Sequence, residues 1–392
     1  MMRVLVYADF RSPHAQGWAD GLREAGIEVV TLSSHTASPS TAGHDQAHDQ
    51  PLDALSRARA AAIRRLGRRG ADGHGLLGRL RKSQLLHTGL AALRVRGERQ
   101  RLRAVIDRSQ PDVVHALRLP YEGLVLLGLS ITQPKIVSTW GQDFVLQAQR
   151  DPVLRWWIRR RLAAADGLHV DNPADVARAH ASGFEPGRPT LHAAGNFGVD
   201  TELFHPGPKD PGLVLCGRRP SLNIDTEAFI QLIQHTSSGA GIQFAMIGLA
   251  EDDPRLAPVR SWVASGQLHC YPSLDRDKFA ELVRSARVVV SPSTSDGMPN
   301  TVLEALASGC QVVAGDLDQL RPLAARESRL HLVDLSQPSE LIQKVFELVD
   351  KASDASRESL AVQGEYSRAA NAFRVPAFYR AVVTQAGKCN RW

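Results

Sequence analysis

Two carboxylates lie close together in a Gly/Pro-rich stretch of the chain, SDGMPNTVLEALASG at residues 295–309. Asp296 precedes the turn residues, and Glu304 lies about one turn into a helix that the sequence predicts from about Asn300. The unpaired N–H groups and the positive dipole end of such a helix start favour phosphate or sugar oxygens. An ordinary strand–loop–helix unit, with Asn300 as the helix cap, would carry the same residues. The stretch therefore indicates either a well-capped helix or a site for a polar, anionic ligand.

The elements around this stretch alternate between strands and helices. The buried strand RVVVS precedes it at 287–291, Gly309 ends the helix, and QVVAG at 311–315 is the next strand. Such alternation builds a parallel, doubly wound sheet, which binds ligands beyond the carboxyl ends of its strands. The same pattern is expected over the rest of the second half, with strands in GLVLCGR, IQFAMIG, QLHCY and RLHLVD and helices at 225–236, 275–285, 301–308 and 339–351.

The first half of the chain shows a similar pattern. RVLVYA is a buried strand, followed by a loop, a helix that ends at Gly26 and the strand IEVVTL. Short β-branched runs return at DVVHA, KIVST and GLHVD. We therefore predict two similar open α/β domains with a cleft between them. The predicted domains cover residues 1–195, with a basic helical insert at about 51–108, and residues 196–370, followed by a terminal helix at 371–392.

The composition indicates a globular protein with one strongly basic segment. The net charge over 392 residues is +6, and 15 Lys or Arg but only three acids fall between Arg57 and Arg108. The four cysteines form no C-x-x-C pair, which favours reduced thiols over a disulfide framework or a metal cluster. The start MMRVLVYADF is too short and too polar for a signal peptide, and no apolar stretch reaches 18 residues. We expect a cytoplasmic protein.

Several motifs resemble those of the family-4 retaining glycosyltransferases, which have the GT-B fold. Residues 285–316 resemble the donor-sugar signature of that family, PS-x-x-E-G-x-P/G-x-x-x-x-E-A-x-A-x-G-x-P-V-V. GNFGVDTELFHPG at 195–207 resembles the segment that leads into the second domain, and LCGRRPSLNID at 215–225 resembles the Gly-Arg segment in its NID variant. STWGQDF at 138–144 resembles the H/W-G-x-D segment. The resemblance covers nearly the whole chain except for about residues 34–108.

The resemblance implies a fold and a reaction. Two Rossmann-like domains would face a central cleft, with the C-terminal helix crossing back to the acceptor-binding first domain. Asp296 would orient the hydroxyls of the donor sugar, Glu304 would accept hydrogen bonds from the ribose, and Arg218 would bind the diphosphate. A hexosyl unit would pass by same-face attack, without metal or cofactor, from a nucleotide sugar to a surface-glycan or lipid-linked saccharide acceptor in polysaccharide biosynthesis. The loop residues expected to hold sugar and phosphate oxygens are Gly297, Met298, Pro299, Asn300 and Thr301.

The donor half departs from the family pattern at two places. The first acid is Asp296 rather than the commoner Glu, so its carboxylate reaches one methylene less and could narrow the choice of sugar. Asn223 stands where the family usually has a phosphate-binding Lys, a role that Arg219 could take. Donor specificity, or loss of activity, is expected to depend on these positions.

The acceptor half also departs from the pattern. Trp140 stands where the family usually has a catalytic-site histidine, so only its backbone carbonyl could serve there, and Asp143 becomes the candidate polar group. His14 lies in the loop that usually carries a Gly pair, and it is a candidate acceptor-side or phosphate-facing group, with plain solvation as the alternative. His115 ends a predicted strand at the cleft edge, where it could contact the acceptor or be a core histidine.

Two other signals concern metal and membrane. Asp316 and Asp318 have a spacing seen in metal-dependent transferases, but a loop aspartate that caps the next helix is expected here, and no metal site is predicted. RWWIRRR at 155–161 and the basic region 57–108 could dock on anionic lipid headgroups at the inner face of the cytoplasmic membrane. The alternative is a solvated cationic face with the tryptophans in the core. No nucleic-acid recognition module is visible.

Two other functions fit the same features. A sugar-nucleotide epimerase on the same two-domain scaffold would need the same donor-binding residues. A homologue that binds a sugar nucleotide without catalysis would also retain them. The extent of the resemblance favours transfer over both.

Overall fold

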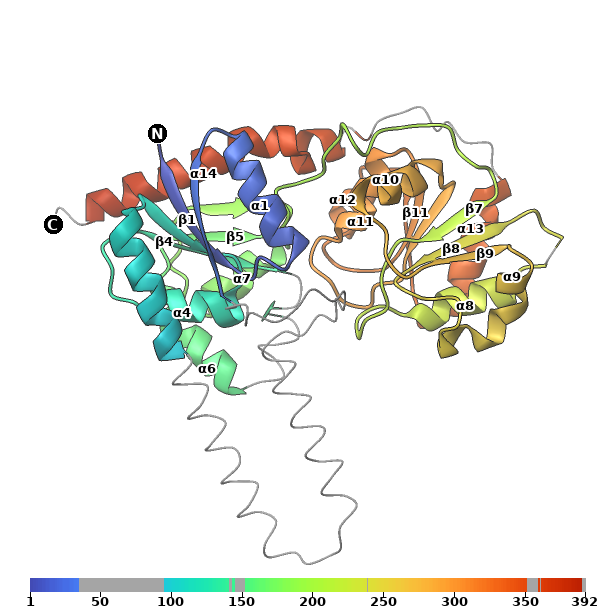
Figure 1. Cartoon of the computed structure of the whole chain (residues 1–392), viewed down its shortest axis with the longest axis horizontal. Coiled ribbons are helices and arrows are strands. Elements are labelled where there is room, and N and C mark those ends of the chain that lie inside the picture. The colour runs from blue at the N-terminus through green and yellow to red at the C-terminus, as the bar shows by residue number, and fades with distance from the viewer. Residues whose placement is uncertain are drawn as a thin grey trace, which may run out of the picture. The chain divides into compact units, whose positions relative to one another are not determined.

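Two six-stranded parallel sheets organise the chain, one in each half (Figure 1). They belong to a computed structural model that describes residues 1–34, 95–140, 143–144, 152–237, 239–350, 359 and 361–389. The predicted α/β fold of the GT-B type is confirmed by these two sheets and their helices. Most of the predicted basic insert, residues 51–94 of about 51–108, lies outside the described residues, and residues 95–109 are helical.

The N-terminal sheet has the strand order β2-β1-β3-β4-β5-β6. Strands β3 and β5 are buried along their whole length, and β1 and β4 are buried after their first residue, because helices cover both faces of a parallel sheet. The three-residue strand β6 was not predicted, since it has no apolar run of its own. The strands are β1 Arg3–Ala8, β2 Glu28–Ser33, β3 Val113–Ala116, β4 Lys135–Thr139, β5 Gly167–Val170 and β6 Thr190–His192, and the helices between them are α1 Pro13–Glu24, α4 Leu124–Leu126, α6 Pro152–Arg161 and α7 Ala174–Ala181.

The C-terminal sheet has the order β12-β11-β10-β7-β8-β9. The chain runs outward from β7 to β9 and then restarts at β10 beside β7, so the strand order reverses between β7 and β10. Ligands of open α/β sheets bind at this point, beyond the carboxyl ends of the strands. The strands are β7 Leu213–Cys216, β8 Gln243–Ile247, β9 Leu268–Tyr271, β10 Val288–Ser291, β11 Gln311–Gly315 and β12 Leu330–Val333, and the helices are α8 Thr226–Gln234, α9 Arg260–Ala264, α10 Arg276–Ser285, α11 Asn300–Ala307, α12 Arg321–Ala324 and α13 Pro338–Asp350.

The last helix, α14 Arg368–Cys389, packs against elements of the N-terminal half, including α1 and β6 (Figure 1). The indole of Trp18 on α1 donates to the hydroxyl of Tyr379 across 3.2 Å. Just before α14, Ser367 pairs in parallel with Val199, so the two segments that flank the C-terminal sheet in sequence lie side by side. The helix is held by buried ring contacts as well as by backbone pairing.

Two buried histidines join neighbouring strands of the N-terminal sheet. The ring of His115 on β3 bonds Tyr379 through Nδ1 and Ser138 through Nε2, the latter at 2.7 Å. The Ser138 hydroxyl lies 2.8 Å from Nδ1 of His169, whose Nε2 lies 3.0 Å from the carbonyl of Ala193. Burial lowers the pKa of His115 and lowers that of His169 to about 3, so both rings are neutral at pH 7.

The neutral histidines should make the fold sensitive to acid. An unfolded histidine protonates near pH 6.5, whereas His169 in the fold resists protonation down to about pH 3, so stability falls as pH drops through this window. At pH 5 the loss from His169 alone is about 2 kcal/mol of unfolding free energy. Denaturant titrations at pH 7 and pH 5 should show it. His169→Gln should reduce the difference in unfolding free energy between pH 7 and pH 5, whereas His269→Gln, at an exposed position, should leave it unchanged. An equal difference in all three proteins would contradict the role of His169.

Candidate functional site

The motif that opened the sequence analysis forms a strand–loop–helix unit at the reversal point of the C-terminal sheet. Strand β10 ends at Ser291, residues 292–299 form a loop that we call the donor loop, and α11 begins at Asn300. The residue that caps α11 is Pro299, and its cap has no side-chain hydrogen bond, so the alternative that Asn300 caps the helix is wrong. The helix start therefore keeps N–H groups that no side chain caps.

Asp296 and Arg218 form an ion pair in this structure. The guanidinium of Arg218, in the loop after β7, contacts Oδ2 of Asp296 closely. Oδ1 of Asp296 accepts a hydrogen bond of 2.9 Å from the N–H of Gly297. Each side chain of the pair is about one-fifth exposed, at 21% for Arg218 and 19% for Asp296. The two residues that were predicted to meet diphosphate and sugar thus lie in contact with each other and remain accessible.

Glu304 is buried in the second turn of α11, with 4% of the residue exposed. Its carboxylate lies 3.3 Å from Nη2 of Arg276 at the start of α10, and this guanidinium lies 5.0 Å from the ring centre of Phe204. Burial raises the pKa of Glu304, and the Arg276 charge opposes that rise. Sequence reasoning missed Arg276 because 28 residues separate it from its partner and only the packing of α10 against α11 unites them.

A half-buried lysine holds the far ends of the same two helices. The ammonium of Lys209 donates to the carbonyls of Arg284 and Ser308, at 2.7 and 2.8 Å, where α10 and α11 end. A cation at the negative end of a helix dipole is favourable, and here one cation serves two helices. Lys209 therefore fixes the spacing of α10 and α11, which carry Arg276 and Glu304.

Asn223, which stands where a phosphate-binding lysine was expected, contacts the donor loop. Its side-chain Nδ2 donates to the carbonyl of Ser295 across 2.6 Å, and its backbone carbonyl accepts from the N–H of Thr294 at 2.9 Å. Asn223 thus stabilises the loop backbone rather than presenting a cation. Arg219 is exposed and lies beside Gly248, where a Cβ would come within 2.8 Å of the Arg219 Cγ.

The remaining predicted loop residues differ in exposure. Met298 and Thr301 are buried, and the methyl of Thr301 packs so closely on Gly217 that a Cβ there would lie 2.6 Å away. A Cβ on Gly297 would lie 2.3 Å from a carboxylate oxygen of Asp171, so any larger residue there would have to displace this side chain. Pro299 turns the chain into α11.

Asp143 and Trp140 were predicted at the acceptor side. The carboxylate of Asp143 is buried, with one oxygen 2.9 Å from Arg118 and the other 3.1 Å from the backbone N–H of Trp140. Asp143 therefore secures the turn after β4 and does not present a free polar group. The indole N–H of Trp140 is buried and has no partner among the described residues.

His14 and His115 have different surroundings. The ring of His14 lies edge-on to Trp140, with centres 5.8 Å apart, and its Nδ1 accepts from Nδ2 of Asn300 at 3.0 Å. His14 thus joins Trp140 and a donor-side residue. His115, by contrast, is fully buried with both ring nitrogens bonded, so of its two predicted roles the core histidine is right and the acceptor contact is wrong.

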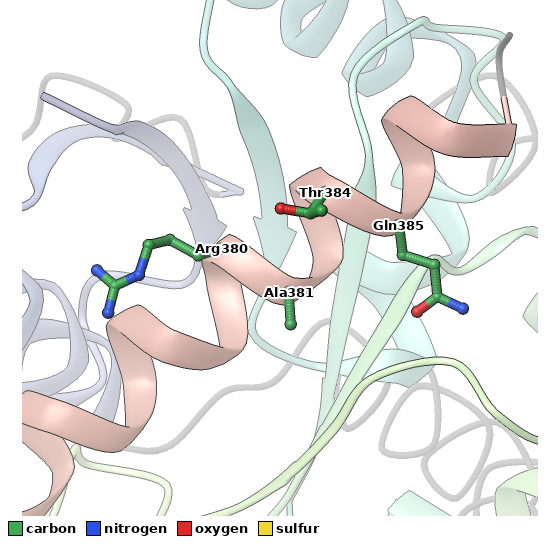
Figure 2. Close-up of a pocket in the computed structure, with 4 residues that line it drawn as sticks. All are labelled: Arg380, Ala381, Thr384 and Gln385. Atoms are coloured by element: carbon green, nitrogen blue, oxygen red, sulfur yellow. The ribbon is translucent and has the colours of Figure 1, made fainter.

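The metal-like spacing after β11 has a different explanation. Arg321 pairs with Asp316 at 2.8 Å and with Asp318 at 3.0 Å, so neither aspartate caps a helix as expected. Within the described ranges, no group of three or more potential metal-binding side chains comes together. A shallow hollow on α14, lined by Arg380, Ala381, Thr384 and Gln385 (Figure 2), has one cation and no carboxylate, and no predicted site residue lines it.

Comparison with known families agrees with this two-part organisation. Residues 12–195 match the family model described as glycosyl transferase 4-like domain. Residues 211–351 match the model described as glycosyl transferases group 1. No curated protein matches the chain. The two matches support a nucleotide-sugar glycosyltransferase of the GT-B type. The second covers all strands of the C-terminal sheet, and the first covers the strands of the N-terminal sheet that follow β1.

Solved structures show the same fold at low sequence identity. Sucrose-phosphate synthase from Thermosynechococcus elongatus is 15% identical, with a TM-score of 0.61, over 100% of this chain and 98% of that one. A glycosyltransferase from Rickettsia africae is 11% identical, with a TM-score of 0.63, over 97% and 98%. Anabaena HepE in complex with UDP and glucose is 13% identical, with a TM-score of 0.60, over 96% and 99%.

Proposed function

We propose that this chain, which carries a glycosyl transferase 4-like domain followed by a glycosyl transferases group 1 domain, is a retaining hexosyltransferase. Its donor is a nucleotide sugar, and its acceptor is a surface glycan or a lipid-linked saccharide. The observation that carries the proposal is the arrangement at the β7–β10 edge, where Arg218 and Asp296 pair and the buried Glu304 lies one turn into α11. The cation Arg218 suits the diphosphate, the short acid Asp296 suits the sugar hydroxyls, and the buried acid Glu304 suits the ribose.

The proposed reaction needs no protein base. The bond between the anomeric carbon and the phosphate oxygen breaks as the acceptor hydroxyl attacks the same face of the sugar, and the leaving phosphate oxygen takes the acceptor's proton. Arg218 leaves Asp296 for the diphosphate and stabilises the charge that develops there, while Asp296 turns to the sugar hydroxyls. Arg218 and the exposed Arg219 supply positive charge, and we propose that no metal is used.

Two unsatisfied polar atoms support a hydroxyl-rich ligand. Nε1 of Trp140 is a buried donor and Oδ1 of Asn300 is a buried acceptor, and neither atom has a hydrogen-bond partner among the described residues. Buried polar atoms without partners cost free energy, so a ligand that offers both donors and acceptors would be favoured there. A saccharide has both on every hydroxyl.

The epimerase and the non-catalytic binder remain the alternative functions. Both would use Arg218 and Glu304 to hold a nucleotide, so binding alone does not separate them from a transferase. The acceptor requirement does, because an epimerase converts its nucleotide sugar without an acceptor and a binder converts nothing.

Release of nucleoside diphosphate from a panel of UDP-, GDP- and ADP-sugars tests the proposal. One donor should be turned over, faster with a saccharide acceptor than by water alone, and EDTA should have no effect. Binding of a donor without release under any condition would favour the non-catalytic alternative. Loss of activity in EDTA, restored by a divalent cation, would contradict metal-independent transfer.

We further propose that α6 contacts an anionic membrane surface from the cytoplasmic side. Trp156 and Trp157 are 51% and 36% exposed, so the alternative that both pack in the core is wrong. Arg160 lies 5.0 Å from the ring centre of Trp156, and Arg161 lies 5.6 Å from that of Trp157. Exposed indoles beside arginines suit a lipid headgroup region. Across the described residues no helix is long and apolar enough to cross a bilayer.

Flotation with vesicles tests this contact. The chain should float with phosphatidylserine-containing vesicles at low salt and less at 0.5 M salt, because screening weakens phosphate contacts. Replacing Arg160 by Ala should weaken binding by about fivefold, and Trp156→Ala should also weaken it. Phe373→Ala, a change of an 80% exposed aromatic on α14, should have no effect. Equal flotation of all four proteins, or none of the wild type, would contradict the proposal.

A further inference from the structure

Three successive carbonyls of the donor loop are each bound by a side-chain amide. Asn223 donates to the carbonyl of Ser295 at 2.6 Å. Gln319 donates through one nitrogen to the carbonyls of Asp296 and Gly297, at 2.7 and 2.8 Å. The two amides come from the loops after β7 and β11, the strands on either side of β10. The donor loop is therefore held from both neighbouring strands.

The orientation of both amides follows from their partners. Both contacts of Gln319 are carbonyl oxygens, which only accept, so its NH₂ group must face the loop and uses both of its hydrogens there. The oxygen of Asn223 lies 2.6 Å from the hydroxyl of Ser221, which donates to it, and this leaves the NH₂ group for Ser295. Gln319 is buried, with 8% exposed, so water does not replace these bonds easily.

These bonds also fix the opposite side of the loop. A trans peptide points its N–H away from its C=O, and the described residues contain no cis peptide. When Gln319 binds the carbonyls of Asp296 and Gly297, the N–H groups of Gly297 and Met298 must point away from it. The first of these donates to Oδ1 of Asp296 at 2.9 Å. Gln319 thereby sets the direction of the Asp296 carboxylate through one peptide unit.

We propose that Gln319, assisted by Asn223, is the positioning residue for the sugar-binding side of the donor loop. It aims the Asp296 carboxylate and the N–H of Met298 at the hydroxyls of the transferred sugar. This inference rests on the proposed function, and it assigns to Gln319 an effect on the sugar rather than on the nucleotide. Among the described residues, Glu304 and Arg218, which meet the nucleotide, form their side-chain hydrogen bonds with groups other than Gln319.

Gln319→Met tests the inference, because methionine has a similar shape and no N–H to donate. Calorimetry with the nucleotide sugar that the wild type binds should show a Kd raised about tenfold, because the misdirected Asp296 carboxylate and Met298 N–H would lose their hydrogen bonds to the sugar hydroxyls. The Kd for the corresponding nucleoside diphosphate without sugar should change less than about twofold. Misplaced sugar should also lower kcat/KM by on the order of 100-fold.

Three comparisons make the result decisive. Gln319→Glu should fail like Gln319→Met, since a carboxylate cannot donate, whereas exposed Gln243→Met should match the wild type. Asn223→Ala should also weaken binding of the nucleotide sugar more than binding of the nucleoside diphosphate, with a smaller loss of affinity than Gln319→Met. This variant serves as the test if the Gln319 variants do not fold. Equal weakening of both ligands, or wild-type affinity for both, would overturn the role of Gln319. A wild type that binds no nucleoside diphosphate would instead overturn the proposed function.

Discussion

Replacing Glu304 by Gln should weaken binding of the donor nucleotide by about 10- to 100-fold, because a carboxylate that accepts from two ribose hydroxyls contributes about 1.5–3 kcal/mol. The variant should not lose stability. Burial raises the pKa of Glu304, which means that the fold disfavours the charged form, and the neutral amide removes this penalty. Calorimetry with the nucleoside diphosphate and a thermal melt measure the two effects separately.

The pH dependence gives a second signature of Glu304. Its carboxylate takes up a proton at a higher pH than an ordinary glutamate, whose pKa is 4.5, so nucleotide affinity should fall as pH is lowered toward that value from above. Glu304→Gln should bind weakly at every pH, without this dependence. Glu281→Gln, an exposed change on α10, should retain wild-type affinity and its pH dependence. Full affinity in Glu304→Gln would contradict the ribose assignment.

Replacing Arg218 by Ala should lower kcat by about 100- to 1000-fold, the effect of removing a preorganised group that stabilises developing charge. Arg218→Lys should recover part of this loss, because a lysine keeps the charge but not the fork geometry that matches a diphosphate. Nucleoside diphosphate release under saturating donor is the measurement.

The matched control for Arg218 is Arg255. This residue also forms an ion pair with an aspartate, Asp253, but its side chain is half exposed. Arg255→Ala should leave kcat unchanged. Asp296→Asn should lower turnover as well, and the double change with Arg218→Ala should cost less than the sum of the two, since the residues act on one ligand and contact each other. Wild-type kcat in Arg218→Ala would remove it from the reaction.

The order of strands and helices could be predicted because it depends on local patterns. Apolar runs such as LVLC at β7 and VVV in β10 indicate buried parallel strands, and Gly309 after α11 indicates a helix end. The two acids of the donor motif could also be placed on one strand–loop–helix unit from spacing alone. The three-residue strand β6 could not be predicted, because it is too short to carry a hydrophobic pattern.

Contacts between distant segments could not be predicted. Gln319 lies 23 positions from its partner Asp296, and Arg276 lies 28 positions from Glu304. The local sequence around each residue does not indicate its partner. The burial of His115 was equally hidden, because a strand-end histidine suits an edge or a core. Asn223 was noticed as a missing cation, but its contact with Ser295 depends on the pairing of β7 with β10.

The most direct test of the account is a proton NMR time course of the nucleotide sugar that the chain binds, recorded with and without a saccharide acceptor. We predict that the donor's anomeric signal disappears faster with acceptor and that the new glycosidic signal has the same anomeric configuration as the donor. A product of opposite configuration would contradict retention. Conversion of one nucleotide sugar into another without acceptor would contradict transfer and identify an epimerase.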